Sequence, residues 1–377
     1  MLRPRVRDEF LRTGASFDYD LAELGFRLRG EQCSIYDEGI DAVLLRSKRH
    51  GNIIANNTYV SSFAYNLAVA WLAYGREYEA FRRRDDCALT RLLRYNLKKF
   101  FAEQILSRTH SVFGLGIFLE TLLYEERAMR PLFAASAGDP ILEARYQYFG
   151  DLMSNLLLFH EVGHLVRDAR ADMEELLLAE IRGAADAPFA ADWSEYPDPG
   201  RTEFLCDTFS LLMASRNVPS CADAVFVLRA IAFGFAMCAC MYGLEKSAAA
   251  TALAYPASGD RDTLGEIHAS LPGASFVIGI DQSAVVRARS ALRVCEVLAG
   301  QQGIDLYAPD GDFPLFPDVI ETTTAFATTV VTDQDPQIRG LCELLARAFH
   351  GHDRGVDYLM SRSKVFKMPP GDSASFT

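Results

Sequence analysis

The stretch NLLLFHEVGHLVRD, Asn155–Asp168, decides how this chain is expected to fold. Its apolar residues fall on most sides of a helix, which is typical of a helix buried in a protein core. Pro140 suits the first turn of the same helix, which is predicted to run to about Arg170. Ionisable side chains interrupt this apolar setting, and burying them without partners would be costly. We therefore expect a core helix that also carries a polar site.

The ionisable residues of this stretch have the spacing of metal ligands. His160 and His164 are four positions apart, so a helix places both imidazoles on one face, about one turn from each other. Glu161 lies about 100° round the helix from His160, which lets it reach a water at the metal without being a ligand. Neutral imidazoles bind Zn²⁺ well, and a nearby carboxylate can take up the proton of the water. The pattern predicts a zinc site with Glu161 as general base. The alternative is a pair of core histidines that bond to neighbouring groups.

Gly163 lies between the two histidines. A glycine inside a helix costs about 1 kcal/mol of stability relative to alanine. Its presence therefore predicts a packing or access requirement directly above this turn of the helix.

Catalytic zinc usually has three protein ligands, so a third must lie elsewhere. One class of zinc proteases extends the motif to H-E-x-x-H-x-x-G-x-x-H, but Arg167 and Arg170 occupy the added glycine and histidine positions. Peptide deformylases take a cysteine from a Glu-Gly-Cys segment, and the chain has none upstream of the motif. The remaining possibility is that a glutamate on a following helix is the third ligand.

The stretch TEFLCDTFS, Thr202–Ser210, is the best source of that glutamate. Glu203 and Asp207 are four apart and share one face of the predicted helix. We predict Glu203 as the third ligand. Asp207 would orient a histidine ring through its other nitrogen. Other acidic residues remain alternatives for the third ligand: Glu174, Glu175, Glu180 and Glu195.

Together the two segments resemble a gluzincin pattern, with H-E-x-G-H on one helix and E-x-x-A-D-x-F-A on a later one. That pattern is found in the cytosolic proteases related to ImmA and IrrE and in the Lit-like phage-exclusion peptidases. Cys206 and Ser210 stand where alanines are usual, and both are small enough for close helix packing. The likeness covers only residues 151–210. It implies a zincin-like helical core and a zinc endopeptidase with a restricted protein substrate.

The rest of the chain is mainly helical in pattern. We therefore expect a mainly α (α+β) fold with a small sheet, whose strand candidates are Ser111–Phe118 and Ser275–Ile280. The further helices are expected at Ser62–Tyr74, Leu89–Leu106, Met173–Ile181, Thr202–Ser215, Ala222–Glu245 and Gln282–Ala299.

Turn signals after Tyr255 predict a subdomain boundary near residue 256. We expect an N-terminal helical region at 1–100, a zincin-like catalytic core at 101–255 and a C-terminal subdomain at 256–377 that packs on the core. The tail at 369–377 is short and polar, so we predict that it is disordered.

Bulk properties narrow the functional classes. The chain has 377 residues, of which 50% are hydrophobic, so it can bury a large core. Its net charge of −12 argues against binding of nucleic acid, whose phosphates recruit basic surface. No apolar signal segment follows Met1, and eight scattered cysteines suggest reduced thiols. We expect a cytoplasmic protein.

A single apolar run requires a membrane test. Ala230–Leu244 contains no charged residue, but it is shorter than the roughly 20 residues that cross a bilayer. We therefore expect a buried helix and no membrane span.

The leading prediction is a Zn²⁺-dependent endopeptidase that acts on a protein or peptide substrate. An aminopeptidase or small-amide hydrolase with the same metal is an alternative, and its pocket would be closed. A helical regulatory or binding protein with a structural or inactive metal site is another. Hydrolysis of an amide also needs a donor for the oxyanion, and the candidates are Tyr196, Arg201, Tyr242 and His268.

Overall fold

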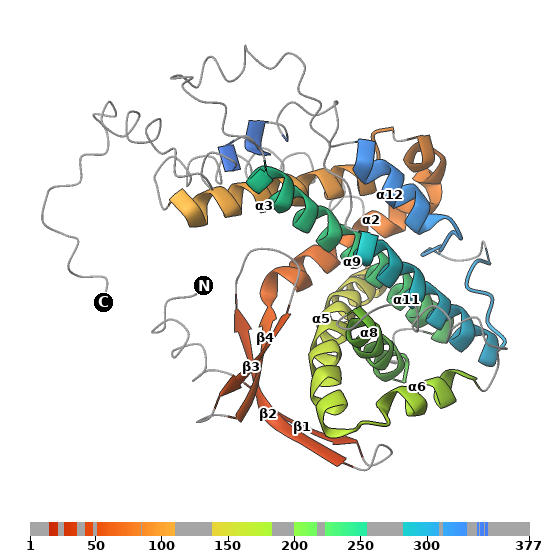
Figure 1. Ribbon diagram of the computed structural model, residues 1–377. Helices are drawn as coiled ribbons and strands as arrows, with labels where there is room; N and C mark the ends of the chain where they lie inside the picture. Colours follow the sequence, from red (N-terminus) through yellow and green to blue (C-terminus); the bar gives the residue numbers. More distant parts are fainter. Residues whose placement is uncertain are drawn as a thin grey trace, which may run out of the picture.

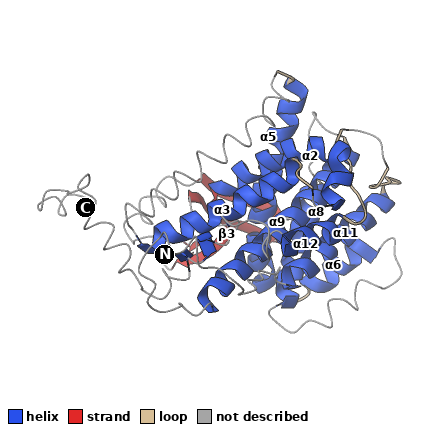
Figure 2. Ribbon diagram, turned by 90° about the horizontal axis from the view of Figure 1, so that it is seen from above, coloured by secondary structure: helices blue, strands red, loops and turns tan. Residues whose placement is uncertain are grey.

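The computed structural model describes residues 15–21, 26–35, 42–47, 51–83, 85–109, 138–182, 200–216, 223–254, 282–308, 312–329, 338, 340–342 and 344–345. Helices predominate in this part of the chain, as Figures 1 and 2 show. The mainly α class that the sequence predicts is therefore confirmed.

The described helices are α2 (Thr58–Arg83), α3 (Ala88–Thr109), α5 (Pro140–Ala169), α6 (Met173–Arg182), α8 (Gly200–Ser215), α9 (Ala224–Ala254), α11 (Gln282–Gln301) and α12 (Val319–Thr329). Each of the helices predicted from the sequence is present. The largest differences are that α2 begins four residues before Ser62 and continues nine residues beyond Tyr74, and that α9 continues nine residues beyond Glu245. The added segment of α9 is rich in alanine, which has the highest helix propensity.

Four strands precede the helices: β1 (Ala15–Leu21), β2 (Phe26–Ile35), β3 (Ala42–Ser47) and β4 (Gly51–Asn57). Their order in the sheet is β1-β2-β4-β3. The β2–β4 pair is parallel, and the β1–β2 and β3–β4 pairs are antiparallel.

The N-terminal helical region predicted for residues 1–100 is therefore wrong over its first half. The segment of β1, ASFDYDL, alternates apolar residues with aspartates, and this period of two is the signal of a strand. The strand candidates Ser111–Phe118 and Ser275–Ile280 lie outside the described residues, as does the tail at 369–377.

Helix α5 begins at a well-formed N-terminal cap. The side chain of Asp139 accepts hydrogen bonds from the backbone N–H groups of Ile141 (2.9 Å) and Leu142 (3.2 Å), and Pro140 occupies the first turn. These contacts satisfy N–H groups that have no partner within the helix. Helix α5 then packs against α2 and α8 and also contacts β3 and β4 (Figure 1).

Helix α8 lies in the interior, surrounded by α5, α6, α9 and α11 (Figure 1). Eleven of its residues are buried, including Asp207. Any polar side chain on α8 must therefore find its partner on a neighbouring helix. This position brings residues 203–207 of α8 against residues 160–164 of α5.

One hydrophobic core joins the helices. Trp71 of α2 stacks on Phe233 of α9, with ring centroids 4.7 Å apart, and its indole N–H donates to the carbonyl of Pro314. The same core includes residues of α11 and the buried Leu345. The described part of the predicted C-terminal subdomain thus contributes residues to this core.

Helix α9 contains a stretch, Ala224–Ala250, that is long and apolar enough to cross a membrane by length and composition alone. In its most apolar window, 72% of the residues are buried against the rest of the protein. That burial is typical of a core helix, as expected for Ala230–Leu244.

Candidate metal centre

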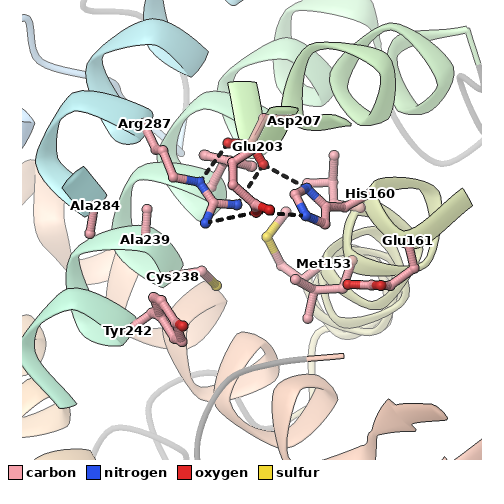
Figure 3. Close-up of a pocket in the computed structure, with 13 residues that line it drawn as sticks. Met153, His160, Glu161, Glu203, Asp207, Cys238, Ala239, Tyr242, Ala284 and Arg287 are labelled. Atoms are coloured by element: carbon pink, nitrogen blue, oxygen red, sulfur yellow. Dashed lines mark hydrogen bonds and ion pairs between the residues drawn. The ribbon is translucent and has the colours of Figure 1, made fainter. Parts of the chain in front are cut away.

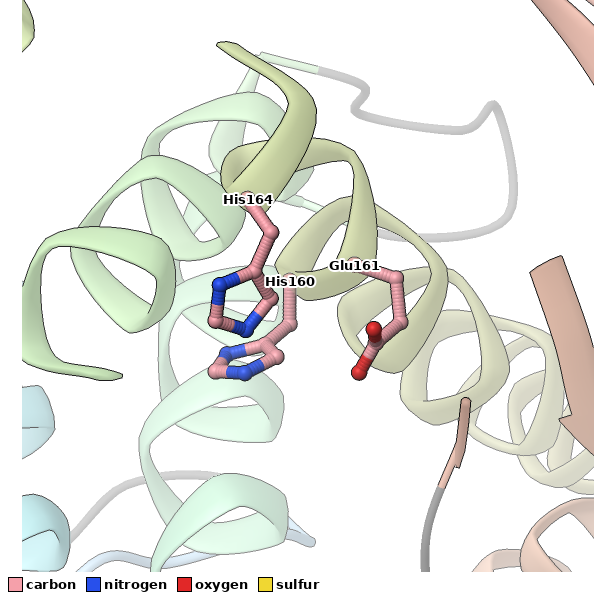
Figure 4. A group of neighbouring side chains, drawn as sticks. All are labelled: His160, Glu161 and His164. Atoms are coloured by element: carbon pink, nitrogen blue, oxygen red, sulfur yellow. The ribbon is translucent and has the colours of Figure 1, made fainter. Parts of the chain in front are cut away.

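Helix α5 presents the three residues of the first motif on one side. Figure 4 shows the imidazoles of His160 and His164 next to each other, with the carboxylate of Glu161 beside them. The two ring centroids are 5.0 Å apart. Possible ligand atoms of all three residues lie within 4.8 Å of one another. The helical spacing of the motif thus brings these groups together as predicted.

Glu203 of α8 reaches both imidazoles. Its Oε2 lies 3.3 Å from Nε2 of His160, and its Oε1 lies 3.7 Å from Nε2 of His164. Ligands at zinc bond lengths of 2.0–2.2 Å and tetrahedral angles are about 3.4 Å apart. Both separations are compatible with ligands of one zinc ion, and we call His160, His164 and Glu203 the candidate metal centre, or metal centre for short.

Glu161 has a different position from Glu203. In the view of Figure 3, Glu161 lies on the opposite side of His160 from Glu203. It lines a cavity that adjoins the metal centre. Glu203 lies close to both rings, which is the position predicted for the third ligand, whereas Glu161 lines the cavity.

Asp207 lies behind the His160 ring, one turn after Glu203 on α8. Its Oδ1 is 2.8 Å from Nδ1 of His160, an ion-pair distance, although the ring is not at a hydrogen-bonding angle to it. Burial alone would lower the pKa of His160, but the Asp207 and Glu203 carboxylates outweigh burial and raise this pKa to about 9. The same negative charge would favour a metal cation at the other ring nitrogen.

The pKa of His164 is shifted in the opposite direction from that of His160. Burial and the neighbouring charge of His160 lower the pKa of His164. This imidazole is thus held in the neutral form, which is the form that binds metal.

Arg287 of α11 completes the site, and the sequence interpretation missed it. Its Nε donates to Oδ2 of Asp207 (2.7 Å) and its Nη2 donates to Oδ1 (2.8 Å), a two-point contact that Figure 3 shows. Its Nη1 lies 3.6 Å from Glu203. Burial alone would raise the pKa of Asp207, but the charges of Arg287 and His160 lower it to about 2. Asp207 is thus a buried carboxylate that stays ionised because it is paired.

A signal for Arg287 was available in the sequence. Helix α11 carries small buried residues at 284, 288 and 291, and Arg287 lies on the same side as the first and the third, three residues after one and four before the other. A charged residue on the apolar stripe of a helix requires a buried partner. The identity of that partner, 80 positions earlier in the chain, could not be read from spacing.

The two motif helices cross at Gly163. A Cβ atom added there would lie 3.0 Å from Cα and 3.1 Å from Cβ of Cys206. Nearby, Ser210 donates a hydrogen bond of 2.6 Å to the backbone carbonyl of Leu156. Gly163 therefore meets the packing requirement predicted from the sequence, and both small residues of α8 serve the contact between the helices.

We expect Gly163→Ala to destabilise the protein by about 1–3 kcal/mol, the usual cost of overpacking a core. The new methyl group would meet the backbone of Cys206, which cannot rotate away. The free energy of unfolding in urea would measure the effect.

Gly300→Ala is the matched control for this change. It adds the same methyl group within α11, where nothing lies within 4 Å of the added atom. Helix propensity alone should then stabilise the protein by up to about 1 kcal/mol. Equal effects of the two substitutions would contradict the close contact at Gly163.

The other residues predicted as oxyanion donors or third ligands differ in whether they line the cavity. Tyr242 lines the cavity beside the metal centre, whereas Arg201 pairs with Glu174 beside α6. The rival ligands Glu174 and Glu175 are not among the residues that line the cavity. Four further candidates cannot be placed, because the side chain of Glu180 and the whole of Glu195, Tyr196 and His268 lie outside the described residues.

No protein-family model, curated protein or solved structure matches this chain. The likeness to gluzincins therefore rests on the two short motifs and on the geometry that joins them.

Proposed function

We propose that this protein is a zinc-dependent endopeptidase with a zincin-like core. One observation carries the proposal: Glu203, from a second helix, reaches the Nε2 atoms of both His160 and His164 at separations suited to one tetrahedral ion. Two histidines and a glutamate are the protein ligands of one established class of catalytic zinc site.

The roles of the residues follow from their positions. A bound zinc ion would acidify a water molecule and polarise the substrate carbonyl. Glu161 takes the proton of the attacking water and passes it to the leaving amine. Asp207, held by Arg287, fixes the orientation of the His160 ring. Tyr242 is the described candidate that lines the cavity and could donate to the oxyanion.

The proposed substrate is a protein or peptide, and the proposed location is the cytoplasm. The six cysteines whose side chains the structure describes are free thiols, in keeping with the proposed reducing compartment. The net charge of −12 disfavours nucleic acid as a partner.

Metal content and cleavage together test the function. We expect about one zinc per purified chain, measured by inductively coupled plasma mass spectrometry, in line with the single centre described above. A chelator should remove both the zinc and the cleavage of a peptide library, and added zinc should restore both.

Cleavage that persists without metal would overturn the proposal. Zinc that is bound without any cleavage would favour the regulatory protein with a structural or inactive metal site.

A further inference from the structure

A second cavity lies where the end of α5 meets the first turns of α6 and α8, three elements that Figure 1 shows close together. Its volume is about 540 Å³. Among the described residues, none lines both this cavity and the one beside Glu161. The second cavity is therefore a separate place on the protein, and the proposed peptidase chemistry does not use it.

Three guanidinium groups line this second cavity. Arg167 and Arg170, at the end of α5, stand where one class of zinc proteases has a glycine and a histidine, and Arg201 belongs to the first turn of α8. All three are partly buried, so their charges are less screened than in open water. Two carboxylates, Asp168 and Glu174, line the cavity with them. Positive charge is thus in excess among the described lining residues.

Ion pairs hold two of the three guanidinium groups in place. Nε and Nη2 of Arg170 donate to Oδ1 (2.7 Å) and Oδ2 (2.6 Å) of Asp172, and Nη2 of Arg201 donates to Oε1 of Glu174. Ion pairs between partly exposed groups contribute little to stability. An anion with a higher charge than a carboxylate can therefore replace Glu174 at Arg201 at little cost.

The number of guanidinium groups favours a phosphate over a carboxylate. One guanidinium matches both oxygens of a carboxylate, whereas a phosphate monoester has three terminal oxygens and a charge of about −1.5 to −2 at pH 7. Arginines from different segments can therefore bind the same phosphate.

The rest of the cavity suits the body of a small molecule. Its volume lies within the roughly 300–1,000 Å³ of small-molecule sites, which is far more than a bare phosphate fills. The buried side chains of Met173 and Leu205 add apolar surface beside the charged groups. Such a site holds the organic part of a phosphate ester next to its phosphate.

We propose that this cavity binds a small molecule that carries a phosphate group, and that the phosphate contacts Arg167, Arg170 and Arg201. The proposal goes beyond the peptidase function and does not depend on it. Because the two cavities have separate linings, the ligand would leave the cavity beside Glu161 open.

Isothermal titration calorimetry with ribose 5-phosphate tests the site, with ribose as the phosphate-free comparison and at constant ionic strength. We expect binding of ribose 5-phosphate only. Arg201→Gln should weaken it by at least about tenfold, because it removes a charged donor to the phosphate. Glu174→Gln should tighten it by up to about fivefold, because the competing carboxylate loses its charge. Loss of folding would not produce opposite effects of two neighbouring substitutions.

Arg289→Gln is the matched control. Arg289 of α11 forms an exposed ion pair with Glu321, 3.2 Å away, and does not line the second cavity. Its substitution removes a guanidinium from an ion pair of the same kind and should leave the affinity unchanged. Circular dichroism would confirm that all three variants fold.

Several outcomes would overturn the proposal. One is equal binding of ribose and ribose 5-phosphate, and another is an affinity that Arg201→Gln leaves unchanged. Weaker binding by Glu174→Gln would contradict a site that its positive charge defines. A phosphoserine peptide and its unphosphorylated form distinguish the source of the phosphate. Binding of the phosphopeptide without binding of ribose 5-phosphate would overturn the assignment to a small molecule.

Discussion

Glu161→Gln is expected to lower peptide-bond hydrolysis by at least about 10²- to 10⁴-fold, the usual contribution of a general acid–base group. Glutamine has nearly the same shape but cannot accept the proton of the attacking water. The metal centre should remain, because its ligands are His160, His164 and Glu203. Initial rates on a quenched fluorescent peptide and zinc content of the same sample would measure both properties.

Glu175→Gln makes the same chemical change at an exposed position of α6 and serves as the control. We expect its rate and its zinc content to equal those of the unmodified protein. A Glu161→Gln protein that cleaves as fast as the unmodified one would show that Glu161 is not the base. Loss of zinc from that variant would instead make Glu161 a ligand, as its place within 4.8 Å of both histidines allows.

Glu203→Ala should have the second large effect, on zinc affinity and on turnover together. It removes the carboxylate that lies 3.3 Å and 3.7 Å from the two ring nitrogens. We expect zinc affinity to fall by more than the roughly 10- to 100-fold that loss of an outer-shell partner costs. Competition with a chromophoric chelator would give the affinity.

Asp207→Asn provides the comparison for this prediction. It leaves all three proposed ligands in place and weakens only the carboxylate behind His160. Its effect on zinc affinity should stay within the roughly 10- to 100-fold range, with some loss of stability because Arg287 loses a charged partner. A greater loss of zinc from the Asp207 variant than from the Glu203 variant would reverse the two roles.

The helices were predictable because their signals are local. Helix α5 combines an apolar surface with a proline in its first turn, and α8 has a face that carries Glu203 and Asp207 one turn apart. The contact between these faces could be predicted from the hypothesis of a zinc site, since two histidines alone would leave a zinc ion without a third protein ligand.

The observed sheet, the partner of Arg287 and the cavity were not predicted, because they depend on contacts between segments that are far apart in the sequence. The strands β1 to β4 are at most ten residues long, and short alternating runs compete poorly with helical patterns in a sequence interpretation. Arg287 and Asp207 meet only because α11 packs against α8. The cavity beside Glu161 is likewise formed by four helices, α5, α8, α9 and α11, and no single segment contains its shape.

The contact between Arg287 and Asp207 sets a lower limit on the fragment that keeps the site intact. A truncation after residue 281 would preserve both motifs, residues 160–164 and 203–207, but would delete α11. Asp207 would then be an ionised carboxylate without its guanidinium partner in the protein interior. A fragment chosen by motif boundaries alone would therefore lack the helix whose arginine holds Asp207 beside His160.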